Sequence, residues 1–136
     1  MNNTRFATAI HVMTLLAKNY PDWMTSDWIA GSININAVMV RDELVILKKN
    51  GLVESKQGKD GGVRLAKNAE EITIADIYAA IKNSEVLGKK NQNPNPLCNV
   101  GKDINENLEV LFSDTDDLVL QFLKGKNLSD FTKQFN

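Results

Sequence analysis

Two reactive side chains occur once each in this 136-residue chain, the thiol of Cys98 and the imidazole of His11. A single cysteine excludes an internal disulfide and a metal cage made of cysteines from one chain. A single histidine excludes a zinc-hydrolase site and argues against a Ser–His–Asp triad. We therefore expect no enzyme, no bound cofactor and no metal site. His11 lies between Ile10 and Val12 in a helical pattern and is expected to be structural.

Cys98 stands at the expected start of a long helix, with Lys102 one turn further on. The positive end of a helix dipole and a nearby cation both favour the thiolate form of cysteine. One interpretation is a redox sensor, in which Cys98 forms a sulfenic acid, a mixed disulfide with a small thiol, or a bridge to the same cysteine of a second chain. The other interpretation is a small buried hydrophobic residue.

A second group of residues has side chains of the types that contact DNA. Asn36 and Arg41 can hydrogen-bond base edges or phosphates. Val38 and Met39 can touch thymine methyl groups. The other DNA-binding candidates are two hydroxyl residues that open a helix, five cations and one glycine: Thr25, Ser26, Arg5, Lys49, Lys56, Lys59, Arg64 and Gly61. Each lysine taken alone is more often a solvated surface charge than a DNA contact.

The formal net charge of −1 is divided unequally along the chain. Residues 1–67 contain nine Lys and Arg against six Asp and Glu, a balance of +3, whereas residues 68–136 have a balance of −4. This asymmetry indicates a basic working surface and an acidic remainder. No apolar run approaches the roughly 18 residues of a membrane span. The N-terminus resembles an amphipathic helix rather than a signal peptide, so we expect a cytoplasmic protein with no membrane partner.

Apolar spacing and turn residues predict three helices followed by a hairpin. The expected elements are helices 4–19, 25–32 and 36–49 and strands 52–56 and 63–66. Pro21 ends the first helix, Asn36 caps the third and Gly51 closes it. The glycine-rich segment 57–62 suits the tip of a hairpin.

The second half is expected to be helical with one long polar loop. Its expected elements are helix 74–82, loop 83–97, helix 100–124 and helix 128–135. The polar run 113–117 is expected to break or kink the long helix. Trp23 and Trp28, which flank the start of the second helix, are expected to pack between it and the first.

One face of the long helix is apolar, because hydrophobic residues recur mostly at steps of three or four. This face comprises Val100, Ile104, Leu108, Leu111, Leu118 and Phe122. A chain of this size has little else to cover such a face, so we expect it to form a dimer interface. An ordinary intrachain core is the alternative.

The order of elements, two helices, a tight turn, a longer helix and a glycine-tipped hairpin, is typical of a winged helix-turn-helix. The sequence therefore predicts a mainly α fold with a small β-hairpin wing and a long C-terminal dimerisation helix. We expect a DNA-binding domain over 1–83, a loop with Cys98 over 84–99, and the dimerisation helix and a short C-terminal helix over 100–136.

Four segments, 4–7 (TRFA), 49–53 (KNGLV), 58–66 (GKDGGVRLA) and 71–77 (EITIADI), resemble one bacterial family. They look like the Rrf-two family of winged helix-turn-helix transcriptional regulators, the group containing IscR, NsrR and CymR, over almost the whole chain. The resemblance implies a homodimer whose long helices cross and whose wings and third helices bind a palindromic site. The loop with Cys98 and its Asn-Pro-Asn-Pro run resembles a cluster-free branch of YwnA-like and HypR-like regulators.

Two features depart from the family pattern. The wing begins with Gln57, where many relatives carry an arginine that enters the minor groove. The iron–sulfur members use three cysteines between the fourth helix and the dimer helix, and this chain has one.

The sequence and the resemblance together thus predict a homodimeric bacterial repressor that binds double-stranded DNA at a palindromic operator. In the sensor interpretation of Cys98, this repressor responds to an oxidant or a small thiol. One alternative is a protein–protein interaction module of the same fold that lacks specific DNA binding. Another is a repressor controlled by a small-molecule ligand, with a pocket near Trp23 and Trp28.

Overall fold

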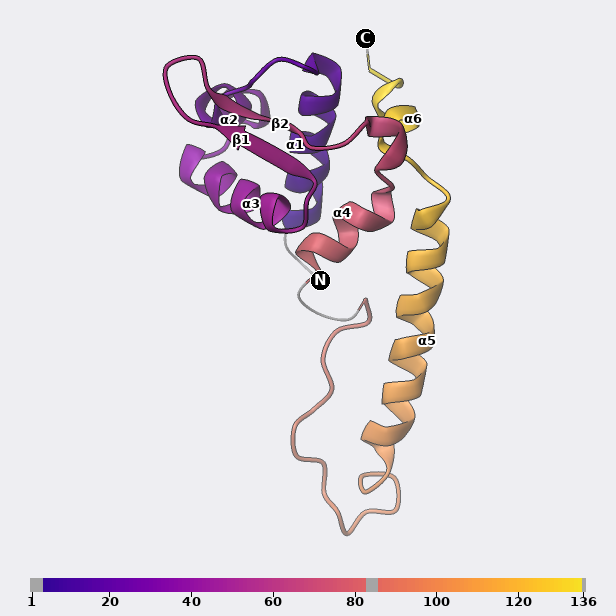
Figure 1. Ribbon diagram of the computed structural model, residues 1–136. Coiled ribbons are helices and arrows are strands. Elements are labelled where there is room, and N and C mark those ends of the chain that lie inside the picture. The colour runs from indigo at the N-terminus through magenta and orange to yellow at the C-terminus, as the bar shows by residue number, and fades with distance from the viewer. Residues whose placement is uncertain (1–3, 83–85, 136) are drawn as a thin grey trace.

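The computed structural model describes residues 4–82 and 86–135 and shows a helical body from which one long helix extends (Figure 1). The elements in chain order are α1 (Arg5–Asn19), α2 (Ser26–Ile33), α3 (Ala37–Lys49), β1 (Val53–Lys56), β2 (Gly62–Leu65), the 3-10 helix η1 (Ala69–Glu71), α4 (Ile74–Ile81), α5 (Ile104–Lys124) and α6 (Leu128–Thr132). The predicted fold class, mainly helical with a two-stranded antiparallel hairpin, is confirmed.

The core of the body is a cluster of mostly aliphatic buried side chains from α1, α2, α3, both strands of the hairpin, α4 and α6, and Leu123 of α5 packs against it. Its fully buried members include Val12, Leu16, Ile29, Leu47 and Ile77. These residues recur at helical spacing on the inner faces of α1, α2, α3 and α4, which is why each helix lies with one face inward. The core fixes α3 on the body and leaves its opposite face to solvent.

The C-terminal helix α6 belongs to this body rather than to α5. Leu128 is fully buried, and its amide donates to the carbonyl of Ile72 at 2.8 Å. The amide of Ile74 donates to the carbonyl of Lys126, also at 2.8 Å. The chain therefore leaves the body after α4, returns along α5 and closes against α1 and η1 (Figure 1). The three-part division at residues 83 and 99 stays a prediction.

Helix α5 is continuous from Ile104 to Lys124, so the predicted break at 113–117 is wrong. The polar side chains of this run cost little because they face solvent or find partners. Thr115 Oγ1 donates to the carbonyl of Leu111 at 2.9 Å. Asp116 accepts from Lys82 Nζ at 3.0 Å and from the amide of Val86 at 2.9 Å, and so ties α5 to the end of α4 and to the loop.

The remaining differences from the sequence prediction lie at element ends. Helix α5 begins at Ile104 rather than at Val100, because residues 96–103 form consecutive turns. Helix α6 ends at Thr132, three residues before the predicted end at Phe135. The sequence pattern does not predict η1. Trp28 is 44% exposed, so it does not pack between α1 and α2 as expected.

Candidate nucleic-acid interface

The turn between α2 and α3 is fixed by two side-chain caps. Thr25 Oγ1 accepts a hydrogen bond from the amide of Trp28 at 3.1 Å, and Asn36 Oδ1 accepts from the amide of Val38 at 2.8 Å. Each cap satisfies an amide that the first turn of a helix leaves without an intrahelical partner. Asn34 between them takes a left-handed backbone conformation with φ of 64°. The sequence candidates Thr25 and Asn36 therefore orient the two helices as well as lying at their exposed starts.

The outer face of the first half of α3 carries the predicted base contacts. Val38 and Met39 are each 52% exposed, while Val40 on the inner face is fully buried. Arg41 is also exposed, and its Nη1 lies 3.5 Å from Ser26 Oγ at the start of α2. The structure thus brings apolar and guanidinium groups together on one exposed surface, the composition that reads base edges in a major groove.

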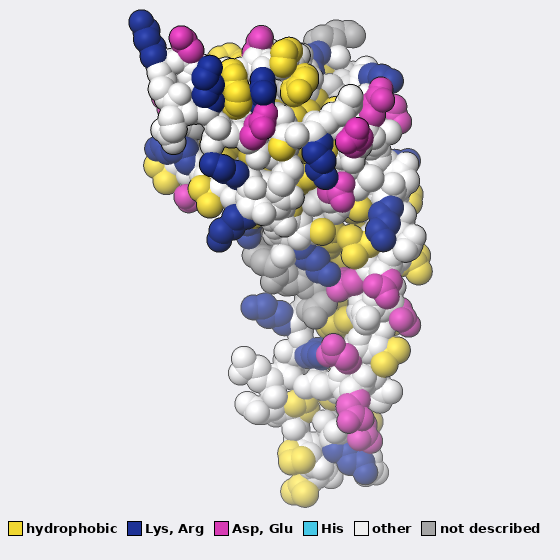
Figure 2. Space-filling model, in the orientation of Figure 1, with side chains coloured by type: hydrophobic (Ala, Val, Ile, Leu, Met, Phe, Trp, Pro, Cys, Tyr) yellow, Lys and Arg dark blue, Asp and Glu magenta, His cyan; other side chains and the backbone are white. Residues whose placement is uncertain are grey.

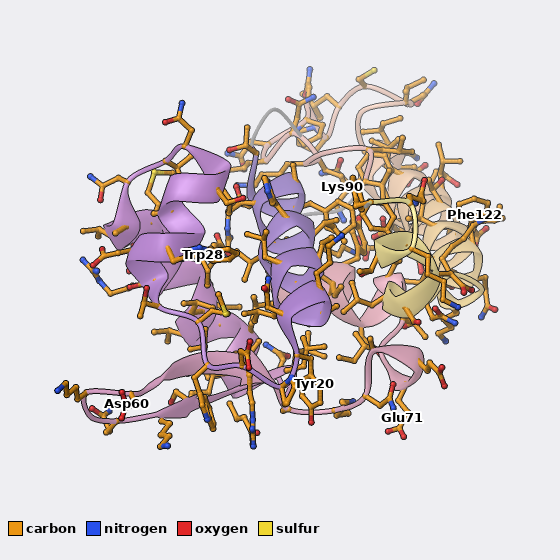
Figure 3. The ribbon with its side chains drawn as sticks, turned by 90° about the horizontal axis from the view of Figure 1, so that it is seen from above. Tyr20, Trp28, Asp60, Glu71, Lys90 and Phe122 are labelled. Atoms are coloured by element: carbon orange, nitrogen blue, oxygen red, sulfur yellow. The ribbon has the colours of Figure 1, made fainter. Side chains whose placement is uncertain are left out.

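The hairpin extends this surface at its tip. Its register pairs Val53 with Leu65 and ends with Lys56 opposite Gly62, so Lys59 lies in the exposed turn beyond the last pair. Figure 3 shows Asp60 at the far end of the hairpin. A Cβ atom on Gly61 would lie 2.0 Å from the carbonyl oxygen of Lys56, so only glycine fits this turn. Lysines at such a tip are free to approach phosphates.

Arg64 does not share this freedom. Its Nε donates to Glu54 Oε2 at 2.7 Å, and its Nη1 to the carbonyl of Pro21 at 3.4 Å. The guanidinium carbon lies 4.1 Å from the ring centroid of Trp23. Trp23 therefore packs on the hairpin. The expectation that it packs between the first two helices is wrong. DNA contact by Arg64 stays a prediction. To bind a phosphate through Nε, the guanidinium would first have to leave Glu54.

Two other predicted cations lie away from the start of α3. Arg5, the first residue of α1, forms an ion pair with the buried carboxylate of Glu43 at 2.9 Å. Lys49 is exposed in the last turn of α3, at the opposite end of the helix from Val38 and Met39. Its neighbour Lys48, which sequence reasoning did not single out, donates to Ser55 Oγ at 2.7 Å and joins α3 to the hairpin.

The apolar face of α5 is largely uncovered within one chain. Leu111, Leu118 and Phe122 are 54%, 73% and 66% exposed, and Ile104 and Leu108 are half-buried. Of the residues of α5, all within the described part of the chain, Asp116 alone is buried. Val100 is 66% exposed in the turn before the helix and so precedes the stripe rather than beginning it. The intrachain-core alternative is therefore wrong for most of this face.

Cys98 is exposed, which excludes its interpretation as a buried hydrophobic residue. Because α5 begins only at Ile104, the dipole of α5 does not act on this thiol as expected. Instead the backbone amide of Gly101, and to a smaller extent that of Val100, lower the pKa of the Cys98 thiol by hydrogen bonding to it. The surrounding loop is tied to α5 by Asn105, whose side-chain amide donates to the carbonyl of Asn91 at 2.9 Å.

A groove of about 360 Å³ lies between α1 and α6, with Ile10, Leu15 and Phe131 among its lining residues. His11 is at its edge, and this imidazole shares a hydrogen bond with Ser32 Oγ at 3.3 Å, which links α1 to α2. The groove does not involve Trp23 or Trp28, where a ligand pocket was considered from the sequence.

Comparison with known proteins assigns the chain to a family. A family model named Rrf2 and described as that of an iron-dependent transcriptional regulator matches residues 2–134. The chain belongs to the Rrf2 family of transcriptional regulators. It is therefore a DNA-binding regulator and not an enzyme. It is 35% identical over 130 residues to the HTH-type transcriptional regulator YwnA of Bacillus subtilis (strain 168), and the match covers 96% of each chain.

Two solved structures show how far the likeness of fold extends. A crystal structure described as that of a DNA-binding protein has a TM-score of 0.75 at 30% identity and covers 93% of this chain and 97% of its own. CymR (YrzC), the global cysteine regulator of B. subtilis, has a TM-score of 0.74 at 21% identity and covers 100% of this chain and 98% of its own. The second likeness is one of fold alone, and it includes the extended α5.

The family description names iron, but the donor atoms of this chain do not fit an iron centre. The chain has one cysteine and one histidine, and they lie on the Cys98 loop and on α1. Within residues 4–82 and 86–135, no three His, Cys, Asp or Glu side chains are grouped closely enough to hold a metal ion. We therefore derive no step of the function through iron. No described helix has both the length and the hydropathy needed to cross a bilayer.

The sequence analysis does not predict that Trp23, Glu54 and Lys48 hold the hairpin in place. One signal for Glu54 was present. In two antiparallel strands that share one tip, Glu54 and Arg64 stand directly opposite each other, and opposite charges at such positions form cross-strand pairs. Trp23 gave no comparable signal, because its position against the hairpin depends on the tertiary fold.

Proposed function

We propose that the protein is a homodimeric repressor that binds a palindromic operator, with α3 in the major groove and the hairpin tip on the adjacent backbone or minor groove. The observation that carries this proposal is the exposed surface on the first half of α3, where Val38, Met39 and Arg41 lie together. Figure 1 shows α3 and the hairpin tip on the side of the body away from α5, so a dimer formed through α5 leaves both free.

The charge distribution supports the same orientation. Residues 1–67 have a balance of +3, whereas α5 carries five acidic residues against one lysine. In Figure 2, many of the lysine and arginine side chains lie over the body. Phosphate neutralisation by lysine and arginine supplies the sequence-independent part of DNA affinity. The body is therefore the part that approaches DNA, in the cytoplasm where bacterial DNA lies.

The dimer rests on the uncovered face of α5. A two-fold interface uses the same patch on both subunits, and the exposed Leu111, Leu118 and Phe122 form such a self-complementary row. A single helix with this much exposed apolar surface is unusual in a monomer. The crossing of two α5 helices would cover it and set the spacing of the two α3 helices.

Regulation by thiol oxidation is the third part of the proposal. Cys98 is exposed and its pKa is lowered, so more of it is thiolate, the form that reacts with oxidants and disulfides. Because the chain has one cysteine, the product is a mixed disulfide with a small thiol, a sulfenic acid, or a bridge between the two subunits. The loop that carries it is fastened to α5, so its modification can alter the dimer.

The proposal is tested by fluorescence anisotropy with DNA from upstream of the protein's own gene, in reductant and after peroxide. We expect tight, salt-dependent binding that oxidation weakens and reductant restores. Arg41→Ala is expected to lower discrimination between operator and unrelated DNA by about 1–3 kcal/mol, because it removes a base contact. Lys133→Ala, which removes one exposed charge directly after α6, is the matched control.

The result that would overturn the proposal is equal affinity for operator and unrelated DNA in the unsubstituted chain. That result would favour a protein–protein interaction module with the same fold. Oxidation that leaves operator binding unchanged would reject only the role of Cys98 and would direct attention to a ligand for the groove between α1 and α6.

A further inference from the structure

A stack of side chains from distant parts of the chain covers one face of the hairpin. The guanidinium carbon of Arg64, on β2, lies 4.1 Å from the ring centroid of Trp23 and 6.0 Å from that of Tyr20. Glu54 on β1 binds the same guanidinium at 2.7 Å. The α1–α2 connection, which carries both aromatic residues, is thus attached to the outer face of the hairpin. Figure 3 shows Tyr20 at the base of the hairpin, opposite the end that carries Asp60.

The backbone of this connection also pairs with the hairpin. The amide of Met24 donates to the carbonyl of Val63, and the amide of Val63 donates to the carbonyl of Met24, both at 2.8 Å. Gly62 makes this approach possible, since a Cβ atom there would lie 2.4 Å from the carbonyl oxygen of Met24. Residue 24 therefore acts as a one-residue third strand at the edge of β2.

Trp23 also reaches toward the tip. The same indole ring lies 5.8 Å from Lys56 Nζ, and Lys56 occupies the last paired position before the turn that holds Lys59. A cation above an aromatic face is attracted by the ring quadrupole. The indole consequently contacts one cation at the middle of the hairpin and one near its end.

We propose that Trp23 and Arg64 are positioning residues that hold the wing in its DNA-binding orientation and that neither residue contacts DNA. This inference rests on the proposed function, in which the wing meets the DNA backbone. Two of the five N–H donors of Arg64 are directed to Glu54 and to the carbonyl of Pro21, and Trp23 covers one face of the guanidinium. A wing fixed in advance loses less conformational entropy on binding than a mobile one.

The inference gives an unusual expectation for a neutral residue. Trp23→Ala removes no charge, yet it is expected to reduce the salt dependence of operator binding because Lys56 and Lys59 are no longer held near phosphates. Each lost phosphate contact lowers the slope of log K against log salt concentration by about 0.9. If two contacts are lost, the fall in affinity between 50 and 200 mM salt is expected to be about 12-fold smaller for the variant than for the wild type. Trp23→Phe keeps an aromatic face and is expected to retain most of the wild-type slope.

A double-mutant cycle separates positioning from direct contact. Adding Lys59→Ala to Trp23→Ala is expected to change affinity by less than about twofold, because the lysine is already displaced, whereas Lys59→Ala alone weakens binding several-fold. Arg64→Gln combined with Lys59→Ala is expected to behave in the same way. The Arg64 cycle also serves if Trp23→Ala fails to give a folded protein by circular dichroism.

Additive effects in both cycles, or a Trp23→Ala slope equal to that of the wild type, would overturn the inference while the proposed function stands. Absence of operator binding by the unsubstituted chain would instead overturn the proposed function, and the role of the wing with it. Loss of one phosphate contact in Arg64→Gln, independent of Lys59, would assign Arg64 to direct DNA contact.

Discussion

The uncovered apolar face of α5 gives a quantitative prediction for Leu118→Ala. Leu118 is the most exposed hydrophobic residue of that helix, at 73%. Its replacement by alanine removes three carbon atoms, worth about 2.4 kcal/mol when fully buried at about 0.8 kcal/mol each. Because Leu118 is 73% exposed in one chain, about three quarters of this transfer free energy, ~1.8 kcal/mol, is gained only when a partner subunit covers the side chain.

The substitution acts twice in a two-fold dimer, because both subunits present the same residue. The expected loss is therefore ~3.6 kcal/mol of dimer stability, which raises the dimer dissociation constant about 400-fold. The fold of the monomer is expected to remain, because Leu118 contributes nothing to the buried core of the body.

Sedimentation equilibrium over a range of protein concentrations measures this change directly. Val45→Ala is the matched control, since Val45 is a comparably exposed hydrophobic residue on α3, outside the α5 face. A dissociation constant that Leu118→Ala leaves within a few-fold of wild type would refute the reasoning. A wild-type protein that stays monomeric at all accessible concentrations would do so as well.

The other predictions concern two glycines, the contact between α5 and the end of α4, and the Cys98 thiol. Gly62→Ala should lower the free energy of unfolding by at least about 2 kcal/mol in urea titrations, because its Cβ would clash with the carbonyl of Met24. Gly31→Ala, with open space around its Cβ, should be neutral or stabilising by up to about 1 kcal/mol. The amide of Val86 and, more weakly, Lys82 lower the pKa of Asp116, so its stabilisation is complete above the ordinary carboxyl pKa and is lost as pH falls through the lowered value. Asp116→Asn should therefore cost about 1–2 kcal/mol at pH 7, with a smaller difference from wild type in acid. Iodoacetamide should alkylate Cys98 with a midpoint pH below that of an ordinary thiol, and a midpoint at or above it would contradict the role of the neighbouring amides.

The helices of the body could be predicted from the sequence because local signals specify them. The caps Thr25, Asn36 and Thr73 and the apolar spacing behind them agree with the packed core, so local preference and tertiary burial point to the same elements. The exposed start of α3 follows from the same pattern, since Val40 and Leu44 must face inward.

The features that could not be predicted depend on contacts between distant segments. A polar run such as 113–117 looks like a helix break unless the partners of Asp116, on α4 and the following loop, are known. Arg64 looks like a phosphate ligand until Trp23, far away in sequence, is placed on top of it. The surroundings of Cys98 were misjudged because a chain of turns, rather than the first turn of α5, supplies the amides near its sulfur.

The separation of basic body and acidic second half has a consequence for how the protein meets DNA. A balance of +3 over residues 1–67, which lie in the body, and five acidic residues against one lysine on α5 give the molecule an electric dipole. In the field of a duplex such a dipole rotates a diffusing molecule so that the body leads and α5 trails.

The same dipole disfavours binding of a second duplex by the DNA-bound protein. Once α3 and the hairpin face one duplex, the outward surface is the acidic one along α5, which repels a second duplex. We therefore expect the DNA-bound protein to have little affinity for a second DNA segment at the α5 end. Raising the salt concentration screens the repulsion together with the attraction, so this selectivity belongs to low and physiological ionic strength.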